Sequence, residues 1–330
     1  MNTKEPILTE DPSRFCLFPI RYPDIWEAYK KQERAIWTAE EINYASDLRD
    51  WESLSGDERF FIENILAFFA GSDGIVLENL VTNFCSEVQI PEARCAYVFQ
   101  AMIENVHNQT YSLLIDTFVK NPERKKELFE AVVTIPAVKE KADWALKWMD
   151  KKKRTFAERL VAFSVVEGVF FSGSFCAVFW LKSRGKMCSA LGTSNELISR
   201  DEGMHTDFAV LLFSKLADKP ERGLVESIFR EAVEIETNFI TESLPCRLIG
   251  MNSTLMERYV KFVADRLISQ LGYKKIYNET NPFPFMENLG LQGKTNFFEK
   301  EVTEYQASAH LNHKSPHDEG DEFSLDEDCF

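Results

Sequence analysis

Two short motifs of the same form stand out among the residues that could do chemistry. Of the five histidines, only His107 and His205 lie in apolar, helix-like segments, and each follows a glutamate, Glu104 or Glu202, by three residues. Residues three apart share one face of a helix. A lone motif of this kind is more often a surface pair or a hydrogen-bonded core histidine. Two of them in apolar helices indicate a divalent metal, because buried carboxylates need a counter-charge.

One further acid precedes each motif. Asp73 lies 31 residues before Glu104, Glu167 lies 35 residues before Glu202, and both acids interrupt strongly apolar segments. Each half of the chain therefore offers an acid, a long helix and then the glutamate–histidine motif, which is the pattern of a ferritin-like di-metal carboxylate bundle. Four carboxylates balance two divalent ions, and this oxygen-rich donor set suits iron or manganese better than structural zinc.

The elements that position these six residues are predicted to be helices. Apolar residues recur with a helical period near 25–52, 57–86, 92–119, 124–148, 155–183, 193–216, 221–246 and 253–272. Turn clusters separate several of these stretches, and Ser55 is placed to cap the second. The expected fold class is all-α, a ferritin-like bundle with additional helices. We expect an N-terminal segment (1–24), one helical domain (25–305) and a flexible acidic tail (306–330).

Composition and charge argue against nucleic acid and membranes as partners and indicate the cellular compartment. The net charge of -15 argues against nonspecific binding to nucleic acid or to anionic lipid. Seven scattered cysteines without a C-x-x-C pair fit a reducing compartment, and Met1–Ser13 has no apolar signal region, so we expect a cytoplasmic protein. The apolar run Val161–Leu181 is long enough to span a bilayer. Its central Glu167 and the lack of a second comparable span favour a buried bundle helix instead.

Several segments then resemble one family in order and across almost the whole chain: the small, radical-generating subunit of class I ribonucleotide reductase, in its eukaryotic form. The segments are WTAEE at 37–41, FFAGSDGIV at 68–76, ENVH at 104–107, NELISRDEGMH at 195–205 and KTNFFE at 294–299. The resemblance implies a small subunit of ribonucleoside-diphosphate reductase. Its two irons, with O2 and an external electron donor, would generate a stable tyrosyl radical that is passed to a large catalytic subunit for making deoxyribonucleotides.

The resemblance also assigns roles to aromatic residues. It implies that Tyr111 carries the radical, and this residue lies one helical turn beyond His107, on the ligand face. Without the resemblance, a core tyrosine with a bonded hydroxyl is the plainer interpretation. The family's apolar wall around the radical corresponds to Phe171, Phe175 and Ile198, which would otherwise be ordinary core residues.

A radical-transfer route to the partner is implied in the same way. It corresponds to Tyr111, His107, Asp201, Trp37 and Tyr305. Asp201 has a physical reason to matter, because a carboxylate beside a ligand can accept the other ring N–H of His107 and fix its tautomer. Trp37 and Tyr305 would separately be taken for packing or surface aromatics.

The acidic C-terminus acquires a role from the resemblance. Residues 318–330 contain seven acids and no base, and family members dock on the large subunit through such a tail. The chain ends in FSLDEDCF, which has one residue, Cys329, more than the family pattern. We expect docking to survive because the tail is flexible. A homodimer is expected, with pairing to a paralogue left open.

Two other functions use the same ligands. A di-iron oxygenase or desaturase would need an open substrate pocket and no radical-transfer residues, whereas Trp37, Tyr305 and the acidic tail argue against it. A nonradical paralogue that only supports assembly would have no need of intact ligands and Tyr111. No phosphate-binding glycine loop or catalytic cysteine set is present, so nucleotide chemistry would belong to the partner.

Overall fold

The computed structural model describes residues 5–286, and every regular element in this range is helical. The longer helices are α1 (Pro23–Arg34), α3 (Gly56–Asn79), α5 (Pro91–Phe118), α8 (Pro136–Met149), α9 (Phe156–Val165), α10 (Ser172–Ser183), α11 (Ala190–Ser214), α12 (Arg222–Asn238) and α13 (Ser253–Gln270). The shorter ones are α2 (Leu48–Ser53), α4 (Cys85–Glu87), α6 (Pro122–Phe129) and α7 (Ala131–Thr134). The predicted all-α fold class is confirmed.

Tighter and wider helical turns join or interrupt these helices. The 3-10 turns are η1 (Pro6–Leu8), η2 (Pro12–Phe15), η3 (Ala39–Glu41), η4 (Tyr44–Asp47) and η8 (Cys246–Ile249). The π-helical turns are η5 (Leu80–Phe84), η6 (Val166–Phe170) and η7 (Phe239–Ser243). Single π-helical turns inside α-helices often mark functional sites.

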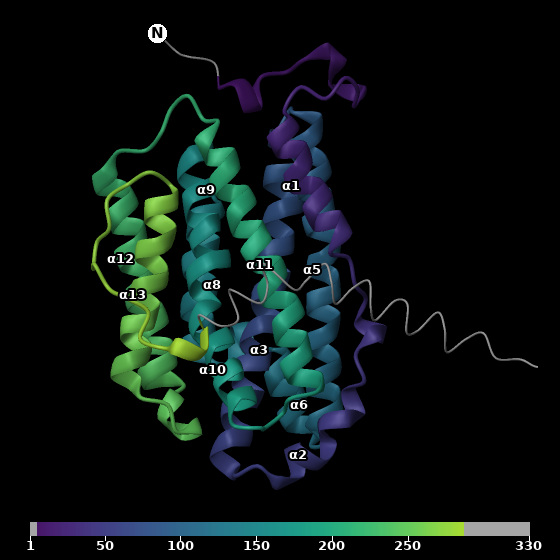
Figure 1. The fold of residues 1–330 in the computed structure, drawn as a ribbon, viewed down its shortest axis with the longest axis vertical. Coiled ribbons are helices and arrows are strands. Elements are labelled where there is room, and N and C mark those ends of the chain that lie inside the picture. The colour runs from purple at the N-terminus through teal and green to yellow at the C-terminus, as the bar shows by residue number, and fades with distance from the viewer. Residues whose placement is uncertain (1–4, 287–330) are drawn as a thin grey trace, which may run out of the picture. The chain divides into compact units, whose positions relative to one another are not determined.

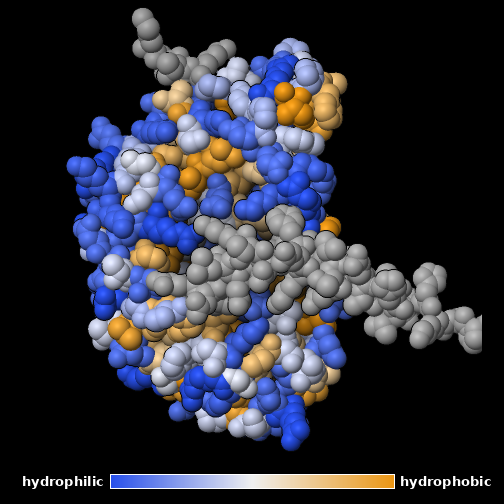
Figure 2. All heavy atoms as spheres, in the orientation of Figure 1, coloured by the Kyte–Doolittle hydropathy of each residue, from blue (hydrophilic) through white to orange (hydrophobic). Residues whose placement is uncertain are grey.

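The long helices run beside one another and enclose the core (Figure 1). Helix α5 packs along α3, and α11 packs against both α5 and α9. Helix α1 covers α5 and α11 on one flank, while α12 and α13 pair on the other and contact η6. The face drawn in Figure 2 is mostly hydrophilic, with apolar residues gathered in patches.

Local sequence signals set where two of the site's helices begin. Ser55 caps α3: its Oγ accepts a bond from the Glu58 backbone N–H at 3.1 Å, and the Glu58 carboxylate accepts one from the Ser55 N–H at 3.0 Å. Thr155 and Glu158 make the same reciprocal capping box at the start of α9. The predicted cap at Ser55 is thus confirmed.

Two predicted helices are wrong in extent. The stretch 25–52 is not one helix, because α1 ends at Arg34 and Thr38 starts a separate 3-10 turn through a capping box with Glu41. The stretch 124–148 divides into α6, α7 and α8, because Pro136 cannot donate to the preceding turn and instead begins α8. Apolar periodicity continues across both breaks and therefore conceals them.

Between residues 5 and 286, two helical stretches are long and apolar enough to span a membrane, judged by length and composition alone. In Phe156–Ser183, 94% of the most apolar window lies buried inside the protein, which agrees with the predicted bundle helix. The expectation that no second comparable stretch exists is wrong, since Gly56–Glu87 also qualifies, with 56% of its window buried. A helix at the centre of a large bundle is apolar on most sides because neighbouring helices bury it on most sides.

The domain boundaries stay predictions. Within the expected N-terminal segment, η1 and η2 precede α1, which begins at Pro23. The end of the expected domain at 305 and the whole tail, 306–330, lie outside the described residues.

Candidate metal centre

Six side chains from four helical elements meet in the middle of the bundle. They come from α3 (Asp73), α5 (Glu104 and His107), η6 (Glu167) and α11 (Glu202 and His205). None is more than 3% exposed. They form two groups within which the possible ligand atoms lie within 4.8 Å of one another, and Glu104 belongs to both groups. The six residues selected by spacing are therefore brought together.

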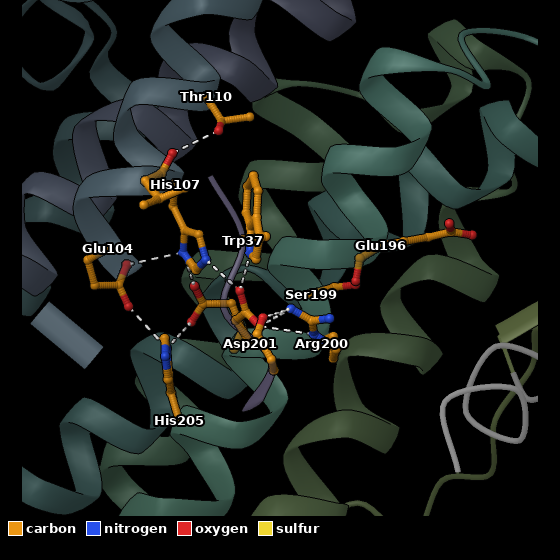
Figure 3. A network of polar contacts seen from close by, with 12 residues as sticks. Trp37, Glu104, His107, Thr110, Glu196, Ser199, Arg200, Asp201 and His205 are labelled. Carbon is orange, nitrogen blue, oxygen red and sulfur yellow. Dashed lines mark hydrogen bonds and ion pairs between the residues drawn. The ribbon is translucent and has the colours of Figure 1, made fainter. Parts of the chain in front are cut away.

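Two glutamates lie between the two imidazoles. Figure 3 shows Glu104 between the two imidazole rings. Glu104 Oε2 lies 3.4 Å from His107 Nδ1, and its Oε1 lies 3.1 Å from His205 Nδ1. Glu202 does the same from α11, with Oε1 3.2 Å from His107 Nδ1 and Oε2 3.4 Å from His205 Nδ1. Each carboxylate thus faces both positions that a metal would take beside a histidine. Asp73 belongs to the group that contains His107, and Glu167 to the group that contains His205.

The polar atoms of this cluster fit metal ions. Each of the six residues has a buried ligand atom without a hydrogen-bond partner among the described residues, including Nδ1 of both histidines. Such atoms are expensive to bury unless something binds them. Four carboxylates balance the charge of two divalent ions, and the oxygen-rich set with one nitrogen for each ion suits hard or borderline metals.

The carboxylates and imidazoles of the cluster bind protons in the absence of a metal. Burial raises the pKa of Asp73 well above its usual value, with help from Glu104, and burial together with Glu202 does the same for Glu167. Burial alone would lower the pKa of His205, but the carboxylates of Glu104 and Glu202 raise it to about 9. The metal-free cluster therefore holds protons. Metal binding must displace them, so it strengthens as the pH rises.

A buried hydrogen-bonded chain leads away from the cluster. Asp201 Oδ2 lies 3.1 Å from His107 Nε2 and accepts a bond from the Trp37 indole N–H at 2.7 Å. The other oxygen, Oδ1, accepts two bonds from the Arg200 guanidinium, at 3.0 and 2.8 Å (Figure 3). Burial would raise the pKa of Asp201, but His107 and Arg200 hold it below its usual value. The carboxylate therefore stays ionised, and His107 turns Nδ1 toward the metal positions.

Tyr111 lies one turn beyond His107 and is only 2% exposed. Its ring stacks on Phe69, with centroids 4.6 Å apart and planes 11° apart, and its hydroxyl has no hydrogen-bond partner among the described residues. Burial raises the pKa of this phenol well above its usual value, and among nearby charges Asp73 adds most. Tyr111 is thus a neutral phenol beside the Asp73 end of the cluster.

The apolar surroundings of Tyr111 are organised through Phe69. Phe171 and Phe175 pack on Phe69, with ring centroids 5.8 and 4.9 Å apart, and Ile198 is 1% exposed on α11. Sequence reasoning named these three residues but missed Phe69. Its position one turn before Asp73, on the same face of α3, was the signal that could have found it.

Two polar residues were also missed. Gln100 donates a hydrogen bond from Nε2 to Glu167 Oε1 at 3.0 Å, and Arg200 holds Asp201 as described above. Gln100 lies one turn before Glu104 on α5, so helical spacing alone could have placed it near the cluster. Tyr305 lies outside the described residues.

An all-helical bundle that buries two glutamate–histidine motifs and two further acids around a common centre defines the class of ferritin-like di-metal carboxylate proteins. Comparison with known families places the chain within that class. A model of the family described as ribonucleotide reductase, small chain, matches residues 14–282. The chain belongs to this family.

Relatives cover nearly the whole chain. A ribonucleoside-diphosphate reductase small chain of Neurospora crassa is 58% identical over 334 residues, which cover 98% of this chain and 81% of the relative. One from Variola virus is 57% identical over 324 residues, covering 98% of this chain and 99% of the relative. A solved structure of the Saccharomyces cerevisiae Rnr4 homodimer is 41% identical with a TM-score of 0.80, covering 92% of this chain and 93% of that one.

These findings confirm the eukaryotic-type resemblance, the ferritin-like fold and the activity, that of a ribonucleoside-diphosphate reductase small subunit. Family membership and the buried cluster together indicate a di-metal site.

Proposed function

We propose that this chain binds two irons at the buried cluster, uses O2 and an external electron donor to oxidise Tyr111, and passes the oxidising equivalent to a large catalytic subunit. The observation that carries the proposal is the burial of Tyr111 one helical turn from a ligand histidine, next to six converging ligand residues. When bound, the reduced metal pair supplies the O2-derived oxidising power that a phenol requires. Manganese is the alternative metal, since the donor set suits both.

The residues around Tyr111 account for a long-lived radical. Loss of one electron and the hydroxyl proton leaves a neutral phenoxyl group. Among nearby charges Asp73 acts most strongly on this phenol, so the proton would leave toward the Asp73 side of the metal centre. Phe69 covers one ring face, and Phe171, Phe175 and Ile198 extend the apolar wall. Such a wall excludes the water and reductants that would quench the radical.

The hydrogen-bonded chain supports a transfer route toward the partner. Trp37 is 3% exposed, and its ring stacks near His107 with centroids 5.9 Å apart. Asp201 connects the two rings through a single oxygen, so a proton and an electron can shift along bonds that already exist. We propose His107, Asp201 and Trp37 as this route, with Tyr305 continuing it.

Burial of the site argues against the oxygenase alternative. All six ligand residues are at most 3% exposed, which suits a small oxidant such as O2 better than a large organic substrate. A nonradical scaffold would likewise gain nothing from keeping a balanced ligand set and a buried phenol beside it.

One experiment tests the proposal directly. We expect apo-protein loaded with Fe2+ without oxygen and then exposed to O2 to show a tyrosyl signal by electron paramagnetic resonance, with about two irons per chain. Two irons without a radical would support the oxygenase. No metal uptake would support the scaffold.

The acidic tail is proposed as the docking element for the large subunit, and the chain as a homodimer in the cytoplasm. A homodimeric solved neighbour and the exposed apolar pair Val98 and Met102 on α5 support the dimer.

Six described cysteines are free, which supports a reducing compartment. We expect a peptide of residues 323–330 to compete with holoenzyme assembly. A peptide that leaves assembly and turnover unchanged, even in large excess, would remove the docking proposal.

A further inference from the structure

Glu167 differs from the other five ligand residues in the backbone that carries it. It lies in η6, the π-helical turn between α9 and α10, whereas the others lie in α-helices. A π-helical turn disturbs the regular bonding of the helix at its ends. At the end of η6, Ser172 Oγ donates to the Val169 carbonyl at 2.7 Å. Side chains therefore take over part of the bonding that a regular helix would supply.

A buried ion pair from two other helices takes over more of it. Lys141 on α8 and Glu236 on α12 form an ion pair, and they are 2% and 0% exposed. Lys141 Nζ also donates to the Phe170 carbonyl at 2.8 Å, and Glu236 Oε1 accepts a bond from the Gly173 backbone N–H at 3.2 Å. The pair thus binds the backbone on both sides of Phe171, directly after η6.

Stability alone gives little reason for this pair. Both groups are removed from water, and the cation–π contacts of the ammonium with Phe68 and Phe239, 3.7 and 3.8 Å from the ring centroids, offset only part of that cost. Burial lowers the pKa of Lys141 to about 8 and raises the pKa of Glu236 to about 7, each against the attraction of its partner. Well-packed apolar residues often stabilise a core at least as well as a buried ion pair does. The backbone bonds of the pair are what an apolar replacement would lack.

Glu236 lies so close to the backbone of Gly173 that only glycine leaves room for it. A Cβ at this position would lie 2.5 Å from Glu236 Oε1, well inside contact distance. Any other residue would therefore push the carboxylate away from the backbone N–H that it accepts from. The lack of a Cβ at Gly173 therefore allows the hydrogen bond between Glu236 and the start of α10.

We propose that Lys141 and Glu236 are positioning residues for the ligand Glu167. They fix the end of η6, three residues beyond Glu167. In this way they set where the Glu167 carboxylate lies relative to Glu202 and His205. The inference rests on the proposed metal function and extends it to two side chains whose hydrogen bonds and ion pair involve none of the six ligands. Without the pair, the metal position that includes Glu167 should weaken, whereas the position that includes Asp73 should keep its ligands.

The test is a titration of metal-free, full-length protein with Mn2+ in the absence of oxygen, followed by electron paramagnetic resonance. The wild type is expected to bind two ions whose spins are coupled. In Lys141→Met, and in the uncharged double variant Lys141→Met/Glu236→Gln, we expect one of the two dissociation constants to rise roughly 10–100-fold, as loss of an outer support of a ligand does. At intermediate Mn2+, the spectrum should show an isolated ion. The double variant leaves no unpaired buried charge, which protects its fold.

The matched control is Arg159→Met. Arg159 is 3% exposed and pairs with Glu87, so this variant also loses one buried cation, yet its partner lies on α4 and not on the segment after η6. We expect a lower melting temperature in the control with both Mn2+ constants and the coupled spectrum unchanged.

The outcomes separate the two proposals. Folded Lys141 variants that bind both ions with wild-type affinity and coupling would overturn the positioning role and leave a merely structural pair. An equal loss of affinity in the Arg159 control would overturn it too. Failure of the wild type to bind two ions would instead overturn the proposed function.

Discussion

Tyr111→Phe is expected to bind metal like the wild type and to lose turnover with the large subunit by on the order of 10³-fold or more, since a reactant group cannot be partly replaced. A phenyl ring keeps the stacking on Phe69 and fills the same space. It has no hydroxyl proton to lose and is far harder to oxidise. Because the Tyr111 hydroxyl has no partner among the described residues, its removal breaks no bond and should leave the melting temperature nearly unchanged.

Metal content, the radical signal and nucleotide reduction should be measured on the same preparation. Trp37→Phe is the informative companion: it leaves Tyr111 in place but removes the indole N–H that Asp201 accepts from. We expect this variant to form the radical and still fail in turnover. Normal nucleotide reduction by Tyr111→Phe would exclude a radical role for this residue, whatever Trp37→Phe does.

Glu104→Ala is expected to abolish binding of both metal ions. Its two oxygens face Nδ1 of both histidines, so both metal positions lose a ligand at once. Loss of an outer support of a metal ligand typically costs roughly 10–100-fold in affinity, and removal of a shared ligand should exceed this at each position. Metal analysis after gel filtration, together with Mn2+ titration, would measure the effect. Activity should vanish as a consequence.

Asp73→Ala provides the comparison, because Asp73 belongs to only one of the two ligand groups. We expect this variant to weaken one ion strongly and the other much less. If Glu104→Ala kept one ion at wild-type affinity, Glu104 would not be shared, and the bridging arrangement would be wrong.

Spacing in the sequence was enough to select the six candidate ligand residues that the structure brings together. Two residues three apart on a helix must share a face, so the paired glutamate–histidine motifs carried their geometry with them. The all-helical fold followed from apolar periodicity in the same way. The breaks at Thr38 and Pro136 depend on capping and on a missing N–H, which periodicity does not register.

Contacts between distant segments were beyond this reasoning. Lys141 stands next to Lys139 and Glu140, and such a run of charges usually marks a solvated helix face. Only the packing of α8 against α12 turns it inward to Glu236. Phe69 and Gln100 were reachable in principle, because each lies one turn from a residue that spacing had already selected. The sharing of Glu104 and Glu202 between both histidines required the bundle itself.

The π-helical turn at Val166–Phe170 makes chain length, as well as residue type, a property of this centre. A π-helical turn holds one residue more than the α-helical turn that it replaces, because its hydrogen bonds join residues five apart and not four. Glu167 lies within the turn. Phe171 and Phe175 follow the turn and pack on Phe69, whose ring stacks on Tyr111. A one-residue deletion here would close the wide turn into an ordinary α-helical turn and so change where Glu167 lies relative to Phe171 and Phe175. Apart from Glu167 itself, homologous chains should therefore tolerate substitutions in this turn more readily than any change in its number of residues.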